Sequence, residues 1–162
     1  MPAKKIVFPT DFSQCSDAAL EYATILAGAL DATLLIIHAE ESPAAYGEGE
    51  ECYGLLEPDH AELQKMLHEI KPTDSNVLYE HRMLSRQGDP ANQIVQFAKE
   101  EDADLIVLGT HGRTGLKRLL MGSIAEAVVR RAPCPVLVMK QSDDPRGLKF
   151  RKSSDVITAD KP

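Results

Sequence analysis

The feature that most constrains the fold of this chain is the alternation of short apolar runs with segments of helical periodicity. The runs at 33–38 (TLLIIH) and 104–108 (DLIVL) are apolar almost without interruption, as in strands covered on both faces. Between such runs the apolar residues recur every three or four positions, which indicates helices with one buried face. A chain of this kind is expected to form a parallel sheet with helices on both sides, joined by right-handed crossovers.

The order of elements expected along the chain is β-α-β-α-β-α-β-α-β. Strands are predicted at 4–9, 33–38, 76–84, 104–108 and 135–139. Helices are predicted over 16–30, between Pro58 and Pro72, after the sequence Gly88-Asp89-Pro90, and over 123–131. The predicted fold class is therefore α/β, a three-layer α/β/α sandwich with a five-stranded parallel sheet in a Rossmann-like arrangement.

One domain is expected, over residues 1–140, because the 162 residues of the chain suffice for a single hydrophobic core. Residues 40–57 are acidic and contain glycine and proline, so a flexible insertion is predicted there. Residues 141–162 are polar and show no sustained periodicity, which predicts a flexible tail.

Composition excludes several classes of function. The net charge of −7 argues against nucleic acid as a partner, since that requires a dense basic face. No apolar run approaches the roughly 18 residues of a membrane span, and the chain opens without a signal-peptide pattern, so no membrane partner and a cytoplasmic location are expected. The three cysteines are scattered, which predicts neither a disulfide framework nor a zinc site; Cys134 is expected to be a small buried hydrophobe.

The segment after the fourth predicted strand carries the residues suited to a phosphate. Gly109 and Gly112 allow the backbone to approach a ligand closely, and Gly122 precedes a helix whose first amides and dipole favour an anion. Arg113, Lys117 and Arg118 add positive charge. These features predict a polyphosphate site, although the segment is neither a P-loop nor a dinucleotide fingerprint.

Three structural alternatives stay open at this point. Ser123 and Glu126 form the spacing of a capping box, so the serine is equally explained as the cap of its helix. Asp11 follows the first strand, where parallel sheets bind ligands, but it is also a candidate N-cap of the first helix. The glycines are likewise compatible with simple turns.

The glycine spacing resembles that of the universal stress proteins of the ATP-binding class. That family is marked by a glycine, two residues, a glycine, nine residues, and then glycine with serine or threonine, which Gly109, Gly112, Gly122 and Ser123 match. The opening IVFPTDFS, the strand ending in His38 and the closing CPVLV are similar too. The resemblance covers about residues 3–140 and implies the adenine nucleotide alpha hydrolase-like version of the fold.

The resemblance also implies a ligand, a site and an assembly. The ligand is ATP with Mg²⁺ or Mn²⁺, with no protein carboxylate assigned to the metal. Asp11 with its neighbours lines the adenosine, the backbone at Ala39 recognises adenine, and the glycine-bearing segment holds the phosphates. Ala125 stands where some members have a hydroxyl residue. A homodimer through the last strand, Val136 to Met139, is implied as well. The implied ligand-binding residues are Pro9, Thr10, Asp11, Ala39, Gly109, Thr110, His111, Gly112, Arg113, Gly122, Ser123 and Ile124.

Three functions are compatible with these features. The leading hypothesis is an ATP-binding, nucleotide-dependent regulatory protein of the stress response that acts as a homodimer. The second is a weak ATPase or phosphotransferase, for which His111 and Asp11 are the only candidate groups to position water or an acceptor, and no catalytic residue is assigned. The third is a dimeric partner-binding module that works without nucleotide.

Overall fold

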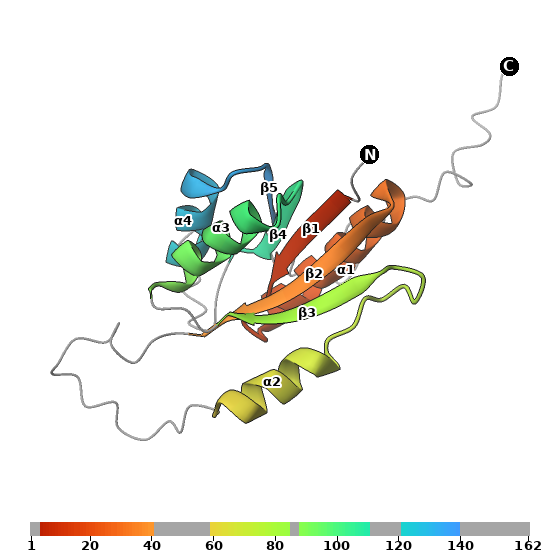
Figure 1. Cartoon of the computed structure of the whole chain (residues 1–162), viewed down its shortest axis with the longest axis horizontal. Helices are drawn as coiled ribbons and strands as arrows, with labels where there is room; N and C mark the ends of the chain where they lie inside the picture. Colours follow the sequence, from red (N-terminus) through yellow and green to blue (C-terminus); the bar gives the residue numbers. More distant parts are fainter. Residues whose placement is uncertain (1–3, 41–58, 85–87, 111–120, 140–162) are drawn as a thin grey trace, which may run out of the picture.

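A computed structural model describes residues 4–40, 59–84, 88–110 and 121–139, and it contains five parallel strands and four helices. The strands run in the spatial order β3-β2-β1-β4-β5 (Figure 1). The predicted fold class is confirmed. Along the chain the elements are β1 (Lys4–Pro9), α1 (Gln14–Leu30), β2 (Ala32–Ala39), α2 (His60–Glu69), β3 (Tyr79–Leu84), α3 (Pro90–Glu100), β4 (Leu105–Gly109), α4 (Ser123–Arg131) and β5 (Val136–Met139).

The helices cover the two faces of the sheet in pairs, which gives the three layers seen in Figure 1. Residues from α3 and α4, such as Phe97 and Val128, pack on one side of the strands around Val7 and Ile106. Residues from α1 and α2, such as Ala23 and Leu67, pack on the other side around Ile36. The central strands are buried on both faces, because their successive side chains enter opposite layers.

The element boundaries differ from the predicted ones where turns and caps intervene. The third strand begins at Tyr79 rather than at residue 76, because the Asp74 carboxylate accepts a hydrogen bond from the Asn76 backbone N–H (2.9 Å) and closes a turn. The second helix begins at His60 rather than at Pro58. Its cap is Asp59, whose side chain accepts a hydrogen bond from the Glu62 N–H at 2.8 Å.

Helix α2 contributes less to the core than its apolar residues indicated. The helical spacing predicts core positions for Leu63, Met66 and Leu67, but Leu67 alone among them is fully buried. The expectation was wrong for Leu63 and Met66 because α2 lies along β2 and the edge strand β3, at the margin of the sheet.

Cys134 is half-buried rather than buried, and it packs beside the core of the α3–α4 layer. The expectation of full burial was wrong because Cys134 precedes β5, an edge strand that pairs on one side only within the described sheet. Partial burial, with a smaller contribution from nearby Asp104, raises the pKa of the Cys134 thiol. A raised pKa disfavours the reactive thiolate.

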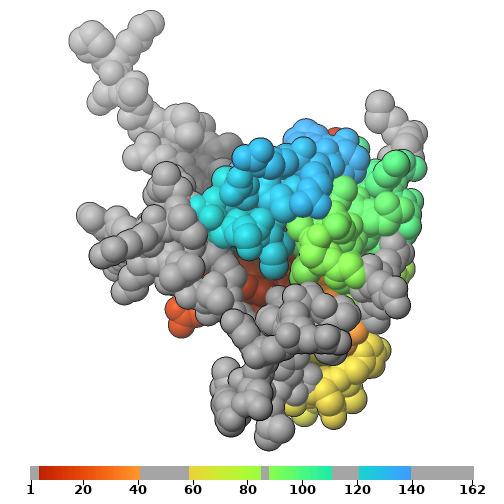
Figure 2. All heavy atoms as spheres, turned by 90° about the vertical axis from the view of Figure 1, so that its left-hand side faces the viewer, coloured from red at the N-terminus to blue at the C-terminus, as the bar shows by residue number. Residues whose placement is uncertain are grey.

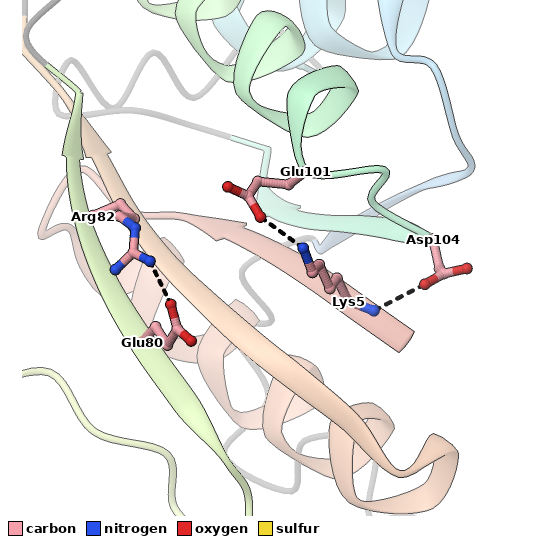
Figure 3. A network of polar contacts seen from close by, with 5 residues as sticks. All are labelled: Lys5, Glu80, Arg82, Glu101 and Asp104. Atoms are coloured by element: carbon pink, nitrogen blue, oxygen red, sulfur yellow. Dashed lines mark hydrogen bonds and ion pairs between the residues drawn. The ribbon is translucent and has the colours of Figure 1, made fainter. Parts of the chain in front are cut away.

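Polar contacts tie the sheet together at the end where β1 and β4 begin (Figure 3). The Lys5 ammonium pairs with Glu101 at 2.7 Å, and the Lys5 backbone N–H donates to the Asp104 carboxylate at 2.8 Å. The hydrogen bond to Glu101 raises the pKa of Lys5. A second pair, Arg82 with Glu80, lies along β3.

Two predictions concern residues that the structure does not describe. The flexible insertion predicted at 40–57, apart from Glu40, and the flexible tail predicted at 141–162 both lie outside the described residues. Among the helices that are described, none combines the length and the apolar character needed to cross a membrane.

Candidate nucleotide-binding site

The strand order places a switch point between β1 and β4. The connection from β1 leads through α1 to β2 on one side, whereas the connection from β4 leads through α4 to β5 on the other. Parallel sheets bind ligands beyond the carboxyl ends of the two strands where the order reverses. Figure 2 looks onto this edge and shows red atoms, from the N-terminal part of the chain, in a hollow between α3 (green) and α4 (cyan).

Pro9 ends the pairing of β1 with β4 at this edge. The Thr10 N–H donates to the Ile37 carbonyl at 2.8 Å, toward β2. Because backbone groups alternate sides along a strand, the nitrogen of Pro9 faces β4, where proline has no hydrogen to donate. Accordingly, β1 pairs with β4 only at Ile6↔Leu105 and Val7↔Ile106, while it pairs with β2 along its whole length. The proline therefore leaves the ends of β1 and β4 unpaired with each other.

The backbone of Ala39 faces the same region. The Glu40 N–H donates to the Leu84 carbonyl of β3 at 2.9 Å. By alternation the N–H and C=O of Ala39 point the other way, toward β1, which has already ended at Pro9. Within the described chain no backbone group pairs with them, since the Thr10 carbonyl instead contacts the His38 ring nitrogen Nδ1 at 2.7 Å. The Ala39 N–H donor and C=O acceptor thus lie side by side and face the end of β1.

The N-terminus of α4 supplies backbone donors on the other side of the switch point. Its N-cap is Gly122, and the Glu126 N–H makes the first intrahelical bond, to the Gly122 carbonyl at 2.9 Å. The amides of residues 123–125 precede that bond, so they have no acceptor inside the helix. No other acceptor for them occurs among the described residues. With the helix dipole, these amides form a place suited to an anion.

The capping-box alternative for Ser123 is wrong. Ser123 is the first helical residue rather than the cap, and no side-chain hydrogen bond caps this helix. The capping position is occupied by Gly122, which can form no such bond. The exposed Ser123 hydroxyl is therefore not explained by the helix itself.

Two of the amides expected to hold phosphate are engaged within the protein. The Thr110 N–H donates to the Met139 carbonyl at 2.9 Å, and the Gly122 N–H donates to the Thr110 carbonyl at 2.6 Å. These bonds fix the start of α4 against the end of β4. Among the described residues of this segment, the amides of residues 123–125 remain without a backbone acceptor, one step further along the chain than Gly122.

Gly109 has a structural reason to be glycine. A Cβ at this position would lie 2.8 Å from the Sγ and 3.1 Å from the carbonyl oxygen of Cys15, in the first turn of α1. Both distances are shorter than ordinary contacts. The close approach of α1 to the end of β4 therefore requires a residue without a side chain.

Asp11 does not cap α1, so that alternative is also wrong. The N-cap is Ser13, whose side chain accepts a hydrogen bond from the Ser16 N–H. The Asp11 carboxylate instead accepts hydrogen bonds from the Ser13 N–H at 3.0 Å and the Ser16 hydroxyl at 2.7 Å. These bonds hold Asp11 at the end of β1. The next residue, Phe12, has a φ of 64°, a left-handed conformation that is uncommon for an aromatic residue and that clusters at functional sites.

A model of the universal stress protein family matches residues 2–140 of the chain. The chain belongs to the universal stress protein family. It is 42% identical over 143 residues to universal stress protein MJ0531 of Methanocaldococcus jannaschii, covering 85% of this chain and 82% of that protein. Universal stress protein A homolog 1 of Coxiella burnetii is 34% identical, and the match covers 86% of this chain and 97% of that one.

Solved structures of similar proteins share the fold. The structure of protein MJ0577 of the same archaeon is 28% identical with a TM-score of 0.64, over 89% of this chain and 100% of that chain. A universal stress protein solved in complex with cAMP is 29% identical with a TM-score of 0.58, over 86% of this chain and 98% of that chain.

A continuous series of contacts brings the described candidate residues of this universal stress protein together. Asp11 bonds Ser16 in the first turn of α1; the neighbouring Cys15 thiol lies 3.8 Å from the Thr110 hydroxyl; and Thr110 accepts from Gly122 at the start of α4. Ile124 lies in the first turn of α4, as expected. His111, Gly112 and Arg113 lie outside the described residues.

Sequence reasoning missed three residues that shape this site: Cys15, Ser16 and Gln93. Cys15 and Ser16 lie in the first turn of α1, which begins at Gln14 and was expected to start at Ser16, so the contacts of Cys15 were not considered. Gln93 offered a visible signal, since it is a polar residue on the same helical face as Phe97 and is buried with it. No group of three or more potential metal-binding side chains occurs among the described residues.

Proposed function

We propose that this universal stress protein binds ATP at the switch point and acts in the cytoplasm as a nucleotide-dependent regulatory protein of the stress response. The observation that carries the proposal is the opening that Pro9 makes between β1 and β4, with backbone groups presented on both sides of it. Ala39 offers one donor and one acceptor, which suit a base, and the α4 amides suit a phosphate. A relative at 29% identity was solved with an adenine nucleotide, cAMP.

The chemistry of the site favours binding over hydrolysis. Its donors are backbone amides, which hold phosphate oxygens without being consumed or titrated. Mg²⁺ or Mn²⁺ would accompany ATP and screen the phosphate charge, held by phosphate oxygens and water rather than by a cluster of carboxylates. Hydrolysis would also require a group that positions water, and Asp11 already uses one carboxylate oxygen to accept two hydrogen bonds from residues of its own loop and helix.

The regulatory role would follow from linkage between binding and conformation. A ligand that binds the folded state stabilises it, and it favours whichever arrangement of the flanking segments contacts it best. The site joins the ends of β1, β2 and β4 to α4, so bound ATP would connect three strands of the sheet to the α3–α4 layer. A homodimer through β5 would lie on the strand next to β4 and thus close to the phosphates.

Thermal unfolding with nucleotide tests the proposal directly. At an ATP concentration 100 times Kd, with Mg²⁺ in excess, the free energy of unfolding should rise by about 2.7 kcal/mol. For a chain of this size that corresponds to an increase in Tm of about 5–10 °C. Sodium triphosphate at equal ionic strength is the control for non-specific anion effects. A Tm that ATP leaves unchanged, together with no heat in calorimetric titration, would show that the proposed function is wrong.

A further inference from the structure

Gln93 is a buried polar residue that joins three segments near the site. It lies in the first turns of α3 and is 2% exposed. Its side-chain amide Nε2 donates to the Glu40 carbonyl at 2.8 Å and to the Gly88 carbonyl at 3.2 Å. Glu40 follows the end of β2, and Gly88 follows β3 with a φ of 123°, which glycine alone adopts readily. One side chain thus connects α3 to the carboxyl ends of two strands.

Two hydrogen bonds at Glu40, one to its N–H and one to its carbonyl, fix the orientation of the Ala39 backbone. The peptide plane between Ala39 and Glu40 contains the Ala39 carbonyl and the Glu40 N–H, which point in opposite directions. The Glu40 N–H is held by the Leu84 carbonyl at 2.9 Å, and the Glu40 carbonyl is held by Gln93. The two bonds secure successive peptide planes, so the strand end cannot rotate without breaking at least one of them.

A fixed backbone pair can distinguish one purine from another. Adenine presents an amino donor at N6, where guanine presents the O6 acceptor. An Ala39 carbonyl held in one direction accepts a hydrogen bond from the adenine N6 amino group and repels the guanine O6 oxygen. If the end of the strand is free to turn, this preference is lost. A site built to make a particular hydrogen bond strongly rejects an analogue that cannot make it.

We infer that Gln93 is a positioning residue for base selection, holding the Ala39 backbone so that the site prefers adenine to guanine. The inference rests on the proposed function, because it assigns the base-recognising half of the same site. In this role Gln93 acts through its hydrogen bonds to the Glu40 and Gly88 carbonyls. The phosphate half of the site, at α4, is held by the backbone bonds of Thr110 and Gly122, in which Gln93 takes no part.

The substitution Gln93→Met tests the inference, since methionine has a similar length and no donor. Dissociation constants for ATP, GTP and inorganic triphosphate would be measured by calorimetry. The ratio of Kd for GTP to Kd for ATP should fall by about tenfold, the loss expected for one neutral hydrogen bond. The affinity for triphosphate should stay unchanged. Gln96→Met is the matched control, because Gln96 lies on the exposed face of the same helix and bonds only Glu100 among the described residues.

The outcomes of this experiment separate failure of the inference from failure of the proposed function. A wild-type chain that binds no ATP would refute the proposed function and the inference with it. A wild-type chain that binds ATP, with an unchanged GTP-to-ATP ratio in Gln93→Met, would overturn the inference alone, and so would a uniform loss for all three ligands. If Gln93→Met fails to fold, Gln93→Ala is the second variant, since alanine favours the helix. Failure of both to fold would assign Gln93 to stability rather than to base selection.

Discussion

At the scale of single residues, Gly109 lies too close to Cys15 to carry a side chain. A methyl group at Gly109 would meet the Cys15 Sγ at 2.8 Å and its carbonyl oxygen at 3.1 Å. We expect Gly109→Ala to lower the free energy of unfolding by about 1–3 kcal/mol through overpacking, measured by urea denaturation. Adding Cys15→Ala should recover part of the loss, because it removes the sulfur and leaves the carbonyl in place.

Gly28 provides the control for this prediction. It lies inside α1, and a Cβ there would meet only the Val77 side chain, at an ordinary 3.7 Å. Gly28→Ala should therefore leave stability unchanged or raise it by about 0.5–1 kcal/mol, since alanine favours the helix. If Gly109→Ala unfolds at the same midpoint urea concentration as the wild type, the packing explanation for Gly109 is wrong.

The residue scale is also where sequence reasoning was least complete. Gly109 was recognised as important, but only as a place for a phosphate, because a glycine in a sequence does not show which side chain approaches it. Its neighbour Cys15 comes from a distant part of the chain, and the contact exists only once α1 lies across β4. Pro9 was assigned to the ligand, while its effect on strand pairing required the register of β1 and β4.

At the scale of elements, the N-terminus of α4 offers a substitution that removes one amide and keeps the helix. Ser123 is the first helical residue, the position where proline is most favourable. Gly122 has φ −71° and ψ 159°, which a following proline permits. Ser123→Pro should therefore fold normally but weaken ATP binding about 10- to 100-fold, the effect of losing one hydrogen bond to a charged group, measured by calorimetry.

The hydroxyl and the amide of Ser123 can be separated by a second variant. Ser123→Ala removes the hydroxyl and keeps the backbone N–H, so its affinity for ATP should exceed that of Ser123→Pro. Circular dichroism would verify that both variants retain their helix. Equal affinity for ATP in the wild type and in Ser123→Pro would show that this amide does not contact the nucleotide.

Elements were predicted better than residues because their signals are local. Apolar runs marked four of the strands, β-propensity marked the strand predicted at 76–84, and helical spacing marked the first three helices. The errors were at boundaries, as at Asp59 and Tyr79, and in the burial of α2. Burial depends on whether a helix covers the middle or the edge of a sheet, and no helix's own sequence contains that information.

At the scale of the whole molecule, the strand order determines both the position of the site and the surface left for assembly. The alternation of elements predicts a parallel sheet, and the order β3-β2-β1-β4-β5 follows from how its connections turn. That order puts the switch point between β1 and β4 and leaves β5 at an edge. An exposed edge strand can pair with a second copy of the chain.

The backbone of β5 shows how a homodimer through this edge can be tested. The Pro135 carbonyl accepts from the Ile106 N–H at 3.0 Å, and the Met139 carbonyl accepts from the Thr110 N–H at 2.9 Å. Odd-numbered residues therefore face β4, and Val138, between two of them, directs its N–H outward. Val138→Pro removes an outward donor and spares the bonds to β4, so it should yield a folded monomer in sedimentation velocity. Leu137→Pro, which removes an inward donor, should instead destabilise the sheet. If Val138→Pro sediments like a dimeric wild type, the interface lies elsewhere on the molecule.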